Sequence, residues 1–239
     1  MNKELTRIID RSQRIVFFGG AGVSTESGIP DFRSADGLYS LESGLNYPPE
    51  EVLSHSFFVS HPAEFFDYYK ANLLHPEARP NPAHLTLAEW EREGKLTAVI
   101  TQNIDGLHQM AGSKTVLELH GSVHRNYCLK CGARYGMDFV LASAAVPRCD
   151  CGGIVRPDVV LYEESLDGAV LERSVRELSA ADTLIVGGTS LAVYPAASLI
   201  HFFSGADLVL INKDPTPADR LATLVIHDPI GRTLGEDSL

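Results

Sequence analysis

Six short apolar runs, separated by longer stretches of helical character, constrain the fold of this chain more than any other feature. Most of the runs lack polar alternation, which is typical of strands buried on both faces of a parallel sheet. The runs are Arg14–Phe18, Leu96–Thr101, Val116–Leu119, Thr183–Val186, Asp207–Ile211 and Leu224–His227. The helical stretches are His61–Leu74, Pro82–Glu93, Ser165–Ala180 and Pro195–Phe203. This alternation predicts an α/β fold with a doubly wound parallel sheet.

Residues 121–157 interrupt the alternation, because they hold all the cysteines, several polar residues and little helical signal. We therefore expect a small metal-binding module there, inserted into a larger domain made of residues 1–120 and 158–239. Residues 34–80 form a further insertion of loop and helix, which begins with the long irregular loop Ser34–Pro49. Loops of this length are uncommon in compact domains and often functional. The tail Gly231–Leu239 is expected to be frayed.

The four cysteines of the chain lie in two short clips, Cys128-x-x-Cys131 and Cys149-x-Cys151. Two such clips supply four thiolates to a tetrahedral zinc ion, whereas disulfides are disfavoured in the cytosol. Four thiolates leave no open position on the metal, so the zinc is expected to hold structure and do no chemistry. Two disulfides, or free redox-active thiols, are the alternatives that the spacing leaves open.

The net charge of −11 and the apolar pattern disfavour two classes of partner. Nucleic acids are bound through Lys and Arg side chains that neutralise phosphates, so an acidic chain is a poor candidate. Met1–Asp10 lacks the continuous apolar region of a secretory signal, and no stretch of the sequence has the roughly 18 apolar residues that span a membrane. We expect a cytoplasmic protein with no nucleic-acid or membrane partner.

The first apolar run leads into a glycine-rich turn, Gly19-Gly20-Ala21-Gly22-Val23-Ser24. Such a turn between a strand and a helix lets backbone N–H groups approach the pyrophosphate of a dinucleotide. The full fingerprint would have a third glycine where Thr25 stands, and a second strand ending in an acidic residue about twenty residues later. Both are missing, so a dehydrogenase-type nicotinamide site is disfavoured. A glycine turn that serves packing alone is the alternative.

Polar residues follow the other runs too, at the edge where open α/β sheets bind ligands. Asn103 and Asp105 have an alternative role as caps of a following helix. His120 is favoured as a functional residue because it ends a strand beside the cysteine module, whereas His108 is expected to be structural. The candidate residues in chain order are Asp31, Phe32, Arg33, Gln102, Asn103, Ile104, Asp105, His120, Gly188, Thr189, Ser190, Asn212 and Lys213.

At these residues the chain resembles the sirtuins, which are NAD-dependent protein-lysine deacylases. The resemblance runs in family order from about residue 14 to residue 230, and its first two motifs are highly specific. It implies a Rossmann-like fold with an altered nucleotide loop, which accounts for the missing third glycine. The matching segments are Gly20-Ala21-Gly22-Val23-Ser24 with Ser27-Gly28-Ile29-Pro30-Asp31-Phe32-Arg33, Thr101-Gln102-Asn103-Ile104-Asp105-Gly106-Leu107-His108, His120-Gly121, the four cysteines, Arg156-Pro157 with Val159-Val160, Gly188-Thr189-Ser190-Leu191 and Ile211-Asn212.

The resemblance implies that NAD, as co-substrate, lies between the large domain and a module that holds one structural Zn²⁺. The nicotinamide-ribose and phosphate end would contact Gly20, Ala21, Gly22, Thr25, Asp31, Phe32 and Arg33. The ribose and the nicotinamide amide would contact Gln102, Asn103, Ile104 and Asp105. The adenosine end would contact Gly188, Thr189, Ser190, Asn212, Lys213 and the backbone near Ile230. The catalytic residues would be His120 and Asn103, and the zinc ligands would be Cys128, Cys131, Cys149 and Cys151.

The reaction that the resemblance implies is deacetylation of lysine at the expense of NAD. Loss of nicotinamide leaves an oxocarbenium-like ribose carbon, which the acetyl oxygen attacks to form an alkylamidate. His120, as general base, then removes a proton from the ribose hydroxyls so that one of them attacks the amidate carbon. The products are free lysine, nicotinamide and O-acetyl-ADP-ribose. Histidine suits this role because its unperturbed pKa of about 6.5 keeps it mostly neutral near pH 7. The Ser34–Pro49 loop would exclude water from the cation.

The implied partners are acetylated-lysine proteins or peptides, which add as a strand between the two domains. Val159, Val160 and Tyr162 match the segment that pairs with the peptide and lines the acyl-lysine tunnel. Glu163 stands where many family members have glycine, which puts the peptide register in question. Members that prefer succinyl groups have a Tyr-x-x-Arg pair before the second motif, but residues 65–72 lack it, so acetyl and longer neutral groups are expected. We expect a monomer.

Three other functions are compatible with parts of the pattern. An NAD-dependent protein ADP-ribosyltransferase would use the same nucleotide site and label a macromolecule. A non-catalytic module that senses NAD or peptide would not need His120. A dehydrogenase would generate NADH from an alcohol or hydroxy acid, and the missing second-strand acid argues against it.

Overall fold

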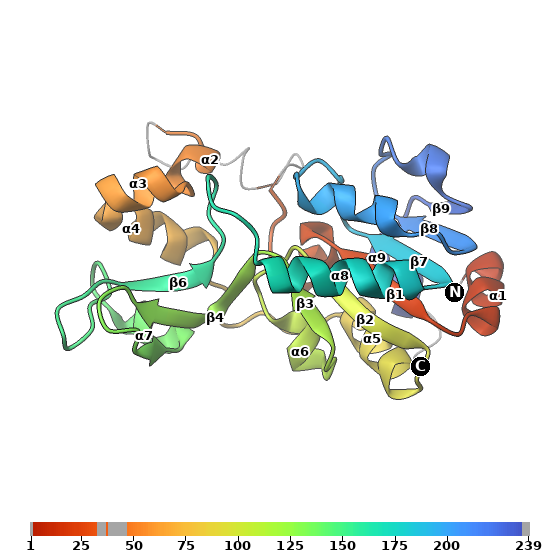
Figure 1. The fold of residues 1–239 in the computed structure, drawn as a ribbon, viewed down its shortest axis with the longest axis horizontal. Helices are drawn as coiled ribbons and strands as arrows, with labels where there is room; N and C mark the ends of the chain where they lie inside the picture. The colour runs from red at the N-terminus through yellow and green to blue at the C-terminus, as the bar shows by residue number, and fades with distance from the viewer. Residues whose placement is uncertain (1, 33–36, 38–46, 236–239) are drawn as a thin grey trace.

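The six predicted strands form one parallel sheet in the larger part of the molecule (Figure 1). The computed structural model describes residues 2–32, 37 and 47–235. The strands are β1 (Ile15–Gly19), β2 (Leu96–Thr101), β3 (Val116–Glu118), β7 (Thr183–Gly187), β8 (Asp207–Ile211) and β9 (Leu224–Ile226). They lie in the order β3-β2-β1-β7-β8-β9, and every neighbouring pair is parallel. The predicted doubly wound α/β fold is confirmed, and each strand lies within one residue of its predicted limits.

Both faces of the sheet are buried, which explains why the strands lack polar alternation. All the residues of β1 and of β7 are buried. On one face, Phe17 and Ile185 pack with apolar residues of three helices, and on the other face Val16 and Leu184 pack with a second group. The helices of the first face are α1 (Lys3–Arg11), α5 (Pro82–Arg92) and α9 (Ile230–Gly235), and those of the second are α8 (Gly168–Ala180) and η4 (Ala196–Phe202).

Three of the predicted helical stretches are confirmed as α4 (Pro62–Asn72), α5 and α8. The fourth, Pro195–Phe203, forms the 3₁₀ helix η4. The prediction of a frayed tail is wrong for residues 231–235, because they belong to α9, whose residues Ile230, Thr233 and Leu234 are buried. The rest of the predicted tail, residues 236–239, lies outside the described part of the chain. Within the described ranges, no helix has the length and apolar character needed to cross a membrane.

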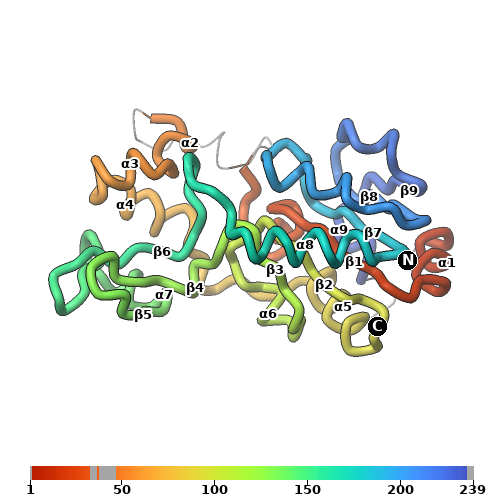
Figure 2. The backbone as a smooth tube through the Cα atoms, in the orientation of Figure 1, coloured from red at the N-terminus to blue at the C-terminus, as the bar shows by residue number. Residues whose placement is uncertain are grey.

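A second, antiparallel sheet forms the core of a smaller part of the molecule. Its strands are β5 (Arg134–Tyr135), β4 (Gly121–Cys128) and β6 (Val155–Val159), and they lie in the order β5-β4-β6. The short helices α2 (Pro49–Val52), α3 (His55–Ser60) and α7 (Met137–Ala142) join α4 in one hydrophobic cluster with this sheet. We call α2, α3, α4, β4, β5, α7 and β6 the small lobe, which lies at one end of the molecule (Figure 2). The limits 121–157 for the zinc module stay a prediction.

The cysteine-containing part of the small lobe lies in the connection between β3 and β7, where the chain passes from one half of the large sheet to the other. β4 begins at Gly121, three residues after β3 ends, and α8 leads from the small lobe into β7. The strand order reverses between β1 and β7, and open α/β sheets bind ligands outside the carboxyl ends of the strands at such a point. The fold therefore favours a ligand site at the turns that follow these two strands.

Candidate active site

The turns that follow β1 and β7 are packed against each other. The 3₁₀ turn η1 (Ala21–Val23) follows Gly20, and the Gly22 N–H donates a hydrogen bond to the Gly188 carbonyl oxygen at 2.8 Å. A Cβ on Gly22 would lie 2.9 Å from the Gly188 Cα, so a side chain has no room there. Gly188 has φ of +56°, which favours glycine, and a Cβ on it would overlap the backbone nitrogen of Val23. The predicted glycine positions are therefore required by close backbone contact.

The turn after β2 is tied to the glycine turn through Ser24, which is almost completely buried. The Ser24 hydroxyl accepts a hydrogen bond from the Asn103 amide at 3.1 Å and donates one to the Asp105 carboxylate at 2.7 Å. The other Asp105 oxygen accepts the N–H of Leu107 at 2.9 Å, at the start of α6 (Leu107–Ala111). Asp105 thus caps a helix, as the alternative interpretation held, and also holds the Ser24 hydroxyl. Ser24 was not among the predicted site residues, and only its place beside the glycine turn could have indicated it.

Gln102 connects the turns of three strands. Its backbone N–H donates to the carbonyl oxygen of Gly19 at 3.0 Å, and its side-chain amide donates to the Thr189 hydroxyl at 3.1 Å. Thr189 is buried, and a Cβ on Gly20 would lie 2.8 Å from the Thr189 Cβ. The ends of β1, β2 and β7 therefore form one continuous polar edge.

His120 lies between this edge and the small lobe, and its hydrogen bond determines its tautomer. Its ring nitrogen Nδ1 is 2.9 Å from the Gln102 carbonyl oxygen, which can only accept, so Nδ1 carries the proton. The other ring nitrogen, Nε2, then has the lone pair of a neutral imidazole. Burial lowers the pKa of His120, and this effect outweighs the opposing effect of the hydrogen bond to Gln102. The ring is therefore held neutral, with Nε2 as its basic atom.

The predicted substrate segment is hydrogen-bonded to the backbone of His120 and to the small-lobe helices. The Val160 N–H donates to the His120 carbonyl oxygen at 3.0 Å. The Tyr162 N–H donates to the Leu53 carbonyl oxygen, and the Tyr162 carbonyl oxygen accepts the N–H of His55, both at 3.0 Å. Residues 160–162 therefore bridge His120 and the helices of the small lobe.

Two glutamates fix the end of this segment. The Glu164 carboxylate accepts hydrogen bonds from Arg156 at 2.8 and 3.0 Å, from the Leu161 N–H and from His55. Burial alone would raise the pKa of Glu164, but the hydrogen bonds from Arg156, Leu161 and His55 outweigh it and lower the pKa to about 2. Glu163 has φ of +74°, and its carboxylate accepts both the N–H and the hydroxyl of Ser56 at 2.9 Å, in the first turn of α3. Glu163 is thus bonded to the small lobe.

The other predicted residues divide between the two lobes. Phe32 and Ile104 pack against the small-lobe cluster, whereas Ile230 is buried in the core of the large sheet. Asn212 directly follows β8, and its amide donates to the Asp214 carbonyl oxygen at 2.7 Å. In the predicted loop Ser34–Pro49, the structure describes only Gly37 and residues 47–49. Arg33 and the rest of the loop lie outside the described residues. His108 is buried beside Phe17, and burial lowers its pKa to about 3, in agreement with a structural role.

The four cysteines converge at the far end of the small lobe. Their Sγ atoms all lie within 4.8 Å of one another, and the Cys128–Cys151 and Cys131–Cys149 pairs are 3.5 Å apart. Tetrahedral zinc with Zn–S bonds of about 2.3 Å would separate the sulfurs by about 3.8 Å, whereas a disulfide needs about 2.05 Å. The Lys130 N–H points at the Cys128 sulfur, at 3.4 Å. The cluster therefore fits one structural zinc ion, and its cysteines are free of disulfides.

Gly121 links His120 to the small lobe, and we expect Gly121→Ala to be strongly destabilising. Its φ is +78°, and a Cβ would overlap the carbonyl oxygen of Asp158 on β6. A non-glycine residue in the left-handed conformation costs roughly 1–2 kcal/mol, and the overlap of its Cβ with backbone adds to that cost. Thermal denaturation should therefore show that the free energy of unfolding falls by more than about 2 kcal/mol. Gly132→Ala is the matched control, because Gly132 has φ of +73° with nothing within 4 Å. Equal losses for the two variants would contradict the close approach at Gly121.

The chain is similar in sequence and structure to known proteins. The Sir2 family model matches residues 20–195. An NAD-dependent protein deacetylase of Clostridium perfringens is 60% identical over 235 residues, which cover 98% of this chain and 96% of the relative. One of Cutibacterium acnes is 59% identical over 232 residues, which cover 97% and 95% of the two chains.

Solved structures of the same family have the same fold. A Sir2 variant with a deacetylated p53 peptide and 3′-O-acetyl ADP-ribose has a TM-score of 0.89 and 41% identity, and the match covers 97% of this chain and 95% of that one. A Sir2 homologue in complex with NAD has a TM-score of 0.87 and 38% identity, with coverage of 99% and 92%. The resemblance drawn from the motifs is confirmed, and the chain belongs to the Sir2 family, the sirtuins.

Proposed function

We propose that His120 is the general base of an NAD-dependent lysine deacetylation catalysed by this chain. The chain is an NAD-dependent protein deacetylase, the activity by which its relatives at 60% and 59% identity are named. The observation that supports the role of His120 is the hydrogen bond from Nδ1 to the Gln102 carbonyl oxygen at 2.9 Å. It leaves Nε2 free to accept a proton from a ribose hydroxyl.

The residues of the sheet edge would bind NAD, which supplies a ribose carbon that becomes electrophilic as nicotinamide leaves. Backbone N–H groups of the glycine turn suit the pyrophosphate. Asn103 would contact the ribose, and its hydrogen bond to Ser24 would hold its amide in place. The full proposed set is Gly20, Ala21, Gly22, Thr25, Asp31, Phe32, Arg33, Gln102, Asn103, Ile104, Asp105, His120, Gly188, Thr189, Ser190, Asn212, Lys213 and Ile230, with Ser24 added.

The acetylated substrate would lie along Val159, Val160 and Tyr162. The Val160–His120 hydrogen bond supports this placement, because it joins the segment to the backbone of the base. Glu163 is bonded to Ser56, which favours a free path for the peptide backbone. The partners would be acetylated-lysine proteins or peptides, with no nucleic acid and no membrane, and the chain would act as a monomer in the cytoplasm.

The function is tested by mass spectrometry of the products formed from an acetyl-lysine peptide and NAD. Deacetylated peptide, nicotinamide and O-acetyl-ADP-ribose are expected in equal amounts, because each turnover moves one acetyl group to one ADP-ribose. A peptide or protein that gains the mass of ADP-ribose would instead indicate an ADP-ribosyltransferase. Unchanged peptide with NAD fully intact would contradict both activities.

We expect the enzyme to prefer neutral over acidic acyl groups. On α4, Phe65, Phe66 and Tyr69 are buried in the small-lobe cluster. The Lys70 ammonium donates to the carbonyl oxygens of Ser143 and Ala145, and Arg156 is paired with Glu164. α4 has no Arg, and its Lys70 already has partners, so a succinyl carboxylate would gain no free cation from this helix, and a buried unpaired charge is costly.

Peptides with acetyl, butyryl and succinyl groups on the same lysine measure this preference. Butyryl and succinyl groups have similar length and differ in charge, so they form a matched pair. The kcat/KM for succinyl-lysine is expected to be at least about tenfold below that for butyryl-lysine, which corresponds to about 1.4 kcal/mol. Faster turnover of succinyl-lysine than of acetyl-lysine would contradict the prediction.

A further inference from the structure

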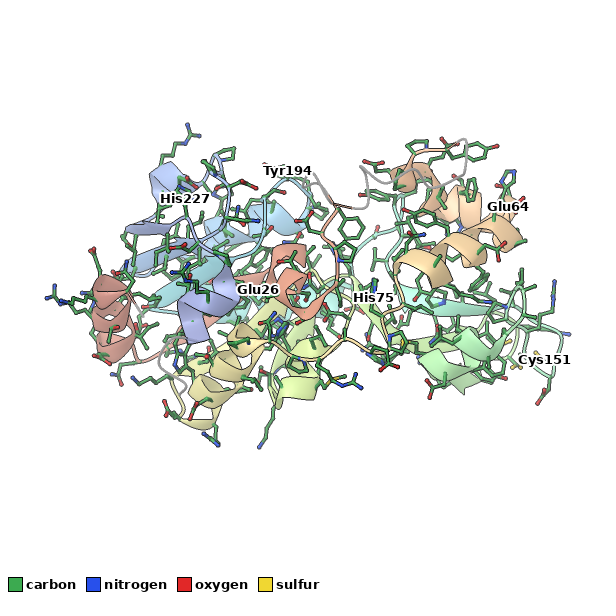
Figure 3. All side chains as sticks on the ribbon, turned by 180° about the vertical axis from the view of Figure 1, so that it is seen from behind. Glu26, Glu64, His75, Cys151, Tyr194 and His227 are labelled. Atoms are coloured by element: carbon green, nitrogen blue, oxygen red, sulfur yellow. The ribbon has the colours of Figure 1, made fainter. Side chains whose placement is uncertain are left out.

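The carboxylate of Glu26 joins two segments that are far apart in the sequence. Glu26 lies in η2 (Thr25–Ser27), directly after the glycine turn. One carboxylate oxygen is 2.5 Å from the Gly231 nitrogen, and the other is 3.2 Å from the Arg232 nitrogen. Figure 3 labels Glu26 where the N-terminal ribbon meets α9. The glycine turn and the C-terminal helix are therefore connected by one side chain.

The contact between Glu26 and α9 requires a glycine at position 231. A Cβ on Gly231 would lie 2.6 Å from the Glu26 Oε2 atom and 2.8 Å from its carboxyl carbon. Gly231 is buried, and the two N–H groups belong to the first turn of α9. Those N–H groups have no partner within their own helix, so a carboxylate is well suited to accept from them.

The segment that Glu26 holds crosses the carboxyl edge of the sheet. The chain leaves β9 at Ile226, at the outer edge, and α9 begins at Ile230, whose side chain packs against Gly187 at the end of β7. On the way, the His227 ring donates from Nδ1 to the Asn212 carbonyl oxygen at 3.1 Å, beyond the end of β8. Residues 227–231 therefore pass the ends of β8 and β7 on their way to the glycine turn.

We infer that Glu26 is a positioning residue for the adenosine half of the NAD site. This inference rests on the proposed function, in which Asn212, Lys213 and the backbone near Ile230 contact the adenosine. Glu26 fixes one end of the crossing segment, the Ile230 side chain fixes the next residue, and together they hold that backbone at a set distance from the glycine turn. Without the carboxylate, the two backbone N–H groups lose their acceptor and the segment is held less firmly.

The negative charge of Glu26, taken alone, predicts the opposite change in affinity when the residue is removed. A carboxylate next to a diphosphate site repels the ligand, so removal of its charge would strengthen binding if Glu26 did nothing else. If Glu26 acts as a positioning residue, its removal weakens binding although a repulsive charge is lost. The sign of the change in affinity therefore separates the two roles.

The experiment measures the Kd for ADP-ribose by calorimetry at a temperature well below unfolding, for the wild type, Glu26→Ala, Glu26→Gln and Glu91→Ala. Glu91 is a matched control, because its carboxylate also accepts two backbone N–H groups, those of Lys114 and Thr115 at 2.7 and 2.8 Å. These two residues precede β3 at the amino edge of the sheet, away from the proposed NAD site. Melting temperatures of all four proteins are recorded alongside.

Glu26→Ala is expected to raise the Kd by about threefold to tenfold, in line with the loss of hydrogen bonds to a charged group. Glu26→Gln keeps one acceptor oxygen and should lie between the wild type and Glu26→Ala. Glu91→Ala should lower the melting temperature and leave the Kd unchanged. In activity assays, Glu26→Ala should raise the KM for NAD and leave the KM for peptide unchanged.

An unchanged or lower Kd for a folded Glu26→Ala protein would overturn the inference, and so would an equal rise for Glu91→Ala. A wild type that does not bind ADP-ribose would overturn the proposed function itself, and the inference with it. The wild-type measurement thus distinguishes the two failures.

Discussion

Replacement of His120 by Ala is expected to lower kcat for deacetylation by about 10²- to 10⁴-fold, the usual contribution of a general base. The ring is placed by its Nδ1 hydrogen bond to Gln102, and its Nε2 is the basic atom. The variant should still bind ADP-ribose with a Kd within about threefold of the wild type, because the glycine turn and Thr189 are unchanged. Steady-state kinetics and calorimetry measure the two effects separately.

Exchange of labelled nicotinamide into NAD gives a sharper readout for the same variant. In the proposed mechanism, nicotinamide leaves before the base acts, so exchange should persist when formation of O-acetyl-ADP-ribose stops. His120→Asn is the matched variant, since its amide can still donate to the Gln102 carbonyl oxygen but is not a base. His201→Ala, at an exposed position on η4, controls for loss of an imidazole elsewhere. A His120→Asn protein with wild-type kcat would exclude the general-base role.

The same imidazole determines the expected pH dependence. Burial lowers the pKa of His120 below its ordinary value of 6.5. The base is active when neutral, and kcat/KM reports the pKa of the free enzyme, so kcat/KM should be constant above that pKa and fall as the pH drops through it. The acid limb of the kcat/KM profile should therefore have its midpoint below pH 6.5 and vanish in His120→Asn. A midpoint above 6.5 would contradict the burial effect.

Removal of zinc is expected to disorder the cysteine end of the small lobe and abolish activity. The hydrophobic cluster there is thin, because its only buried members among the described residues are Cys128, Cys149 and Val155. Structural zinc contributes about 10–16 kcal/mol of apparent binding free energy in zinc-finger peptides, so the metal outweighs this small core. Loss of several kcal/mol corresponds to a fall of about 10 °C or more in melting temperature. Activity should fall with it, since β4 directly follows His120.

Cys149→Ser and chelation of the wild type test this expectation together. Metal analysis should find about one zinc per wild-type chain and close to none in Cys149→Ser, which lacks one of four ligands. Zinc added back should restore the chelated wild type and fail to restore the variant. A zinc-free protein with the melting temperature of the wild type would show that the cluster does not depend on metal.

The central sheet was predictable because its buried strands consist mostly of apolar residues, which the sequence shows directly. β2 (LTAVIT) and β8 (DLVLI) match their predicted ranges, since each contains a run of apolar residues and is followed directly by a polar residue, Gln102 or Asn212. The first helix has a similar local signal, with Leu5, Ile8 and Ile9 on one face and Asn2 as its cap, although no helix was predicted there. The helix α9 gave less signal, because its first turn depends on Glu26, 205 residues away.

The motifs predicted which residues form the candidate site, but they did not predict which side chains contact one another there. The resemblance named Asp105, but the division of its carboxylate between the Leu107 N–H and the Ser24 hydroxyl depends on a contact across 81 residues. The position of the Glu163 side chain could not be predicted either, because its partner Ser56 lies on a helix that was not predicted from the sequence. The sequence is enough to predict a site residue that is defined by its type and its place after a strand. A structure is needed to identify a hydrogen-bond partner that lies far away in the chain.

The two chain segments that join the cysteine-containing part of the small lobe to the large domain run side by side. Gly121 pairs with Val159, and the His120 carbonyl oxygen accepts the Val160 N–H, so the outgoing and returning segments meet at His120. Atoms at the axis of a rigid rotation move least. A displacement of the cysteine-containing part about these paired segments would therefore move the cysteine cluster most and the His120 ring least.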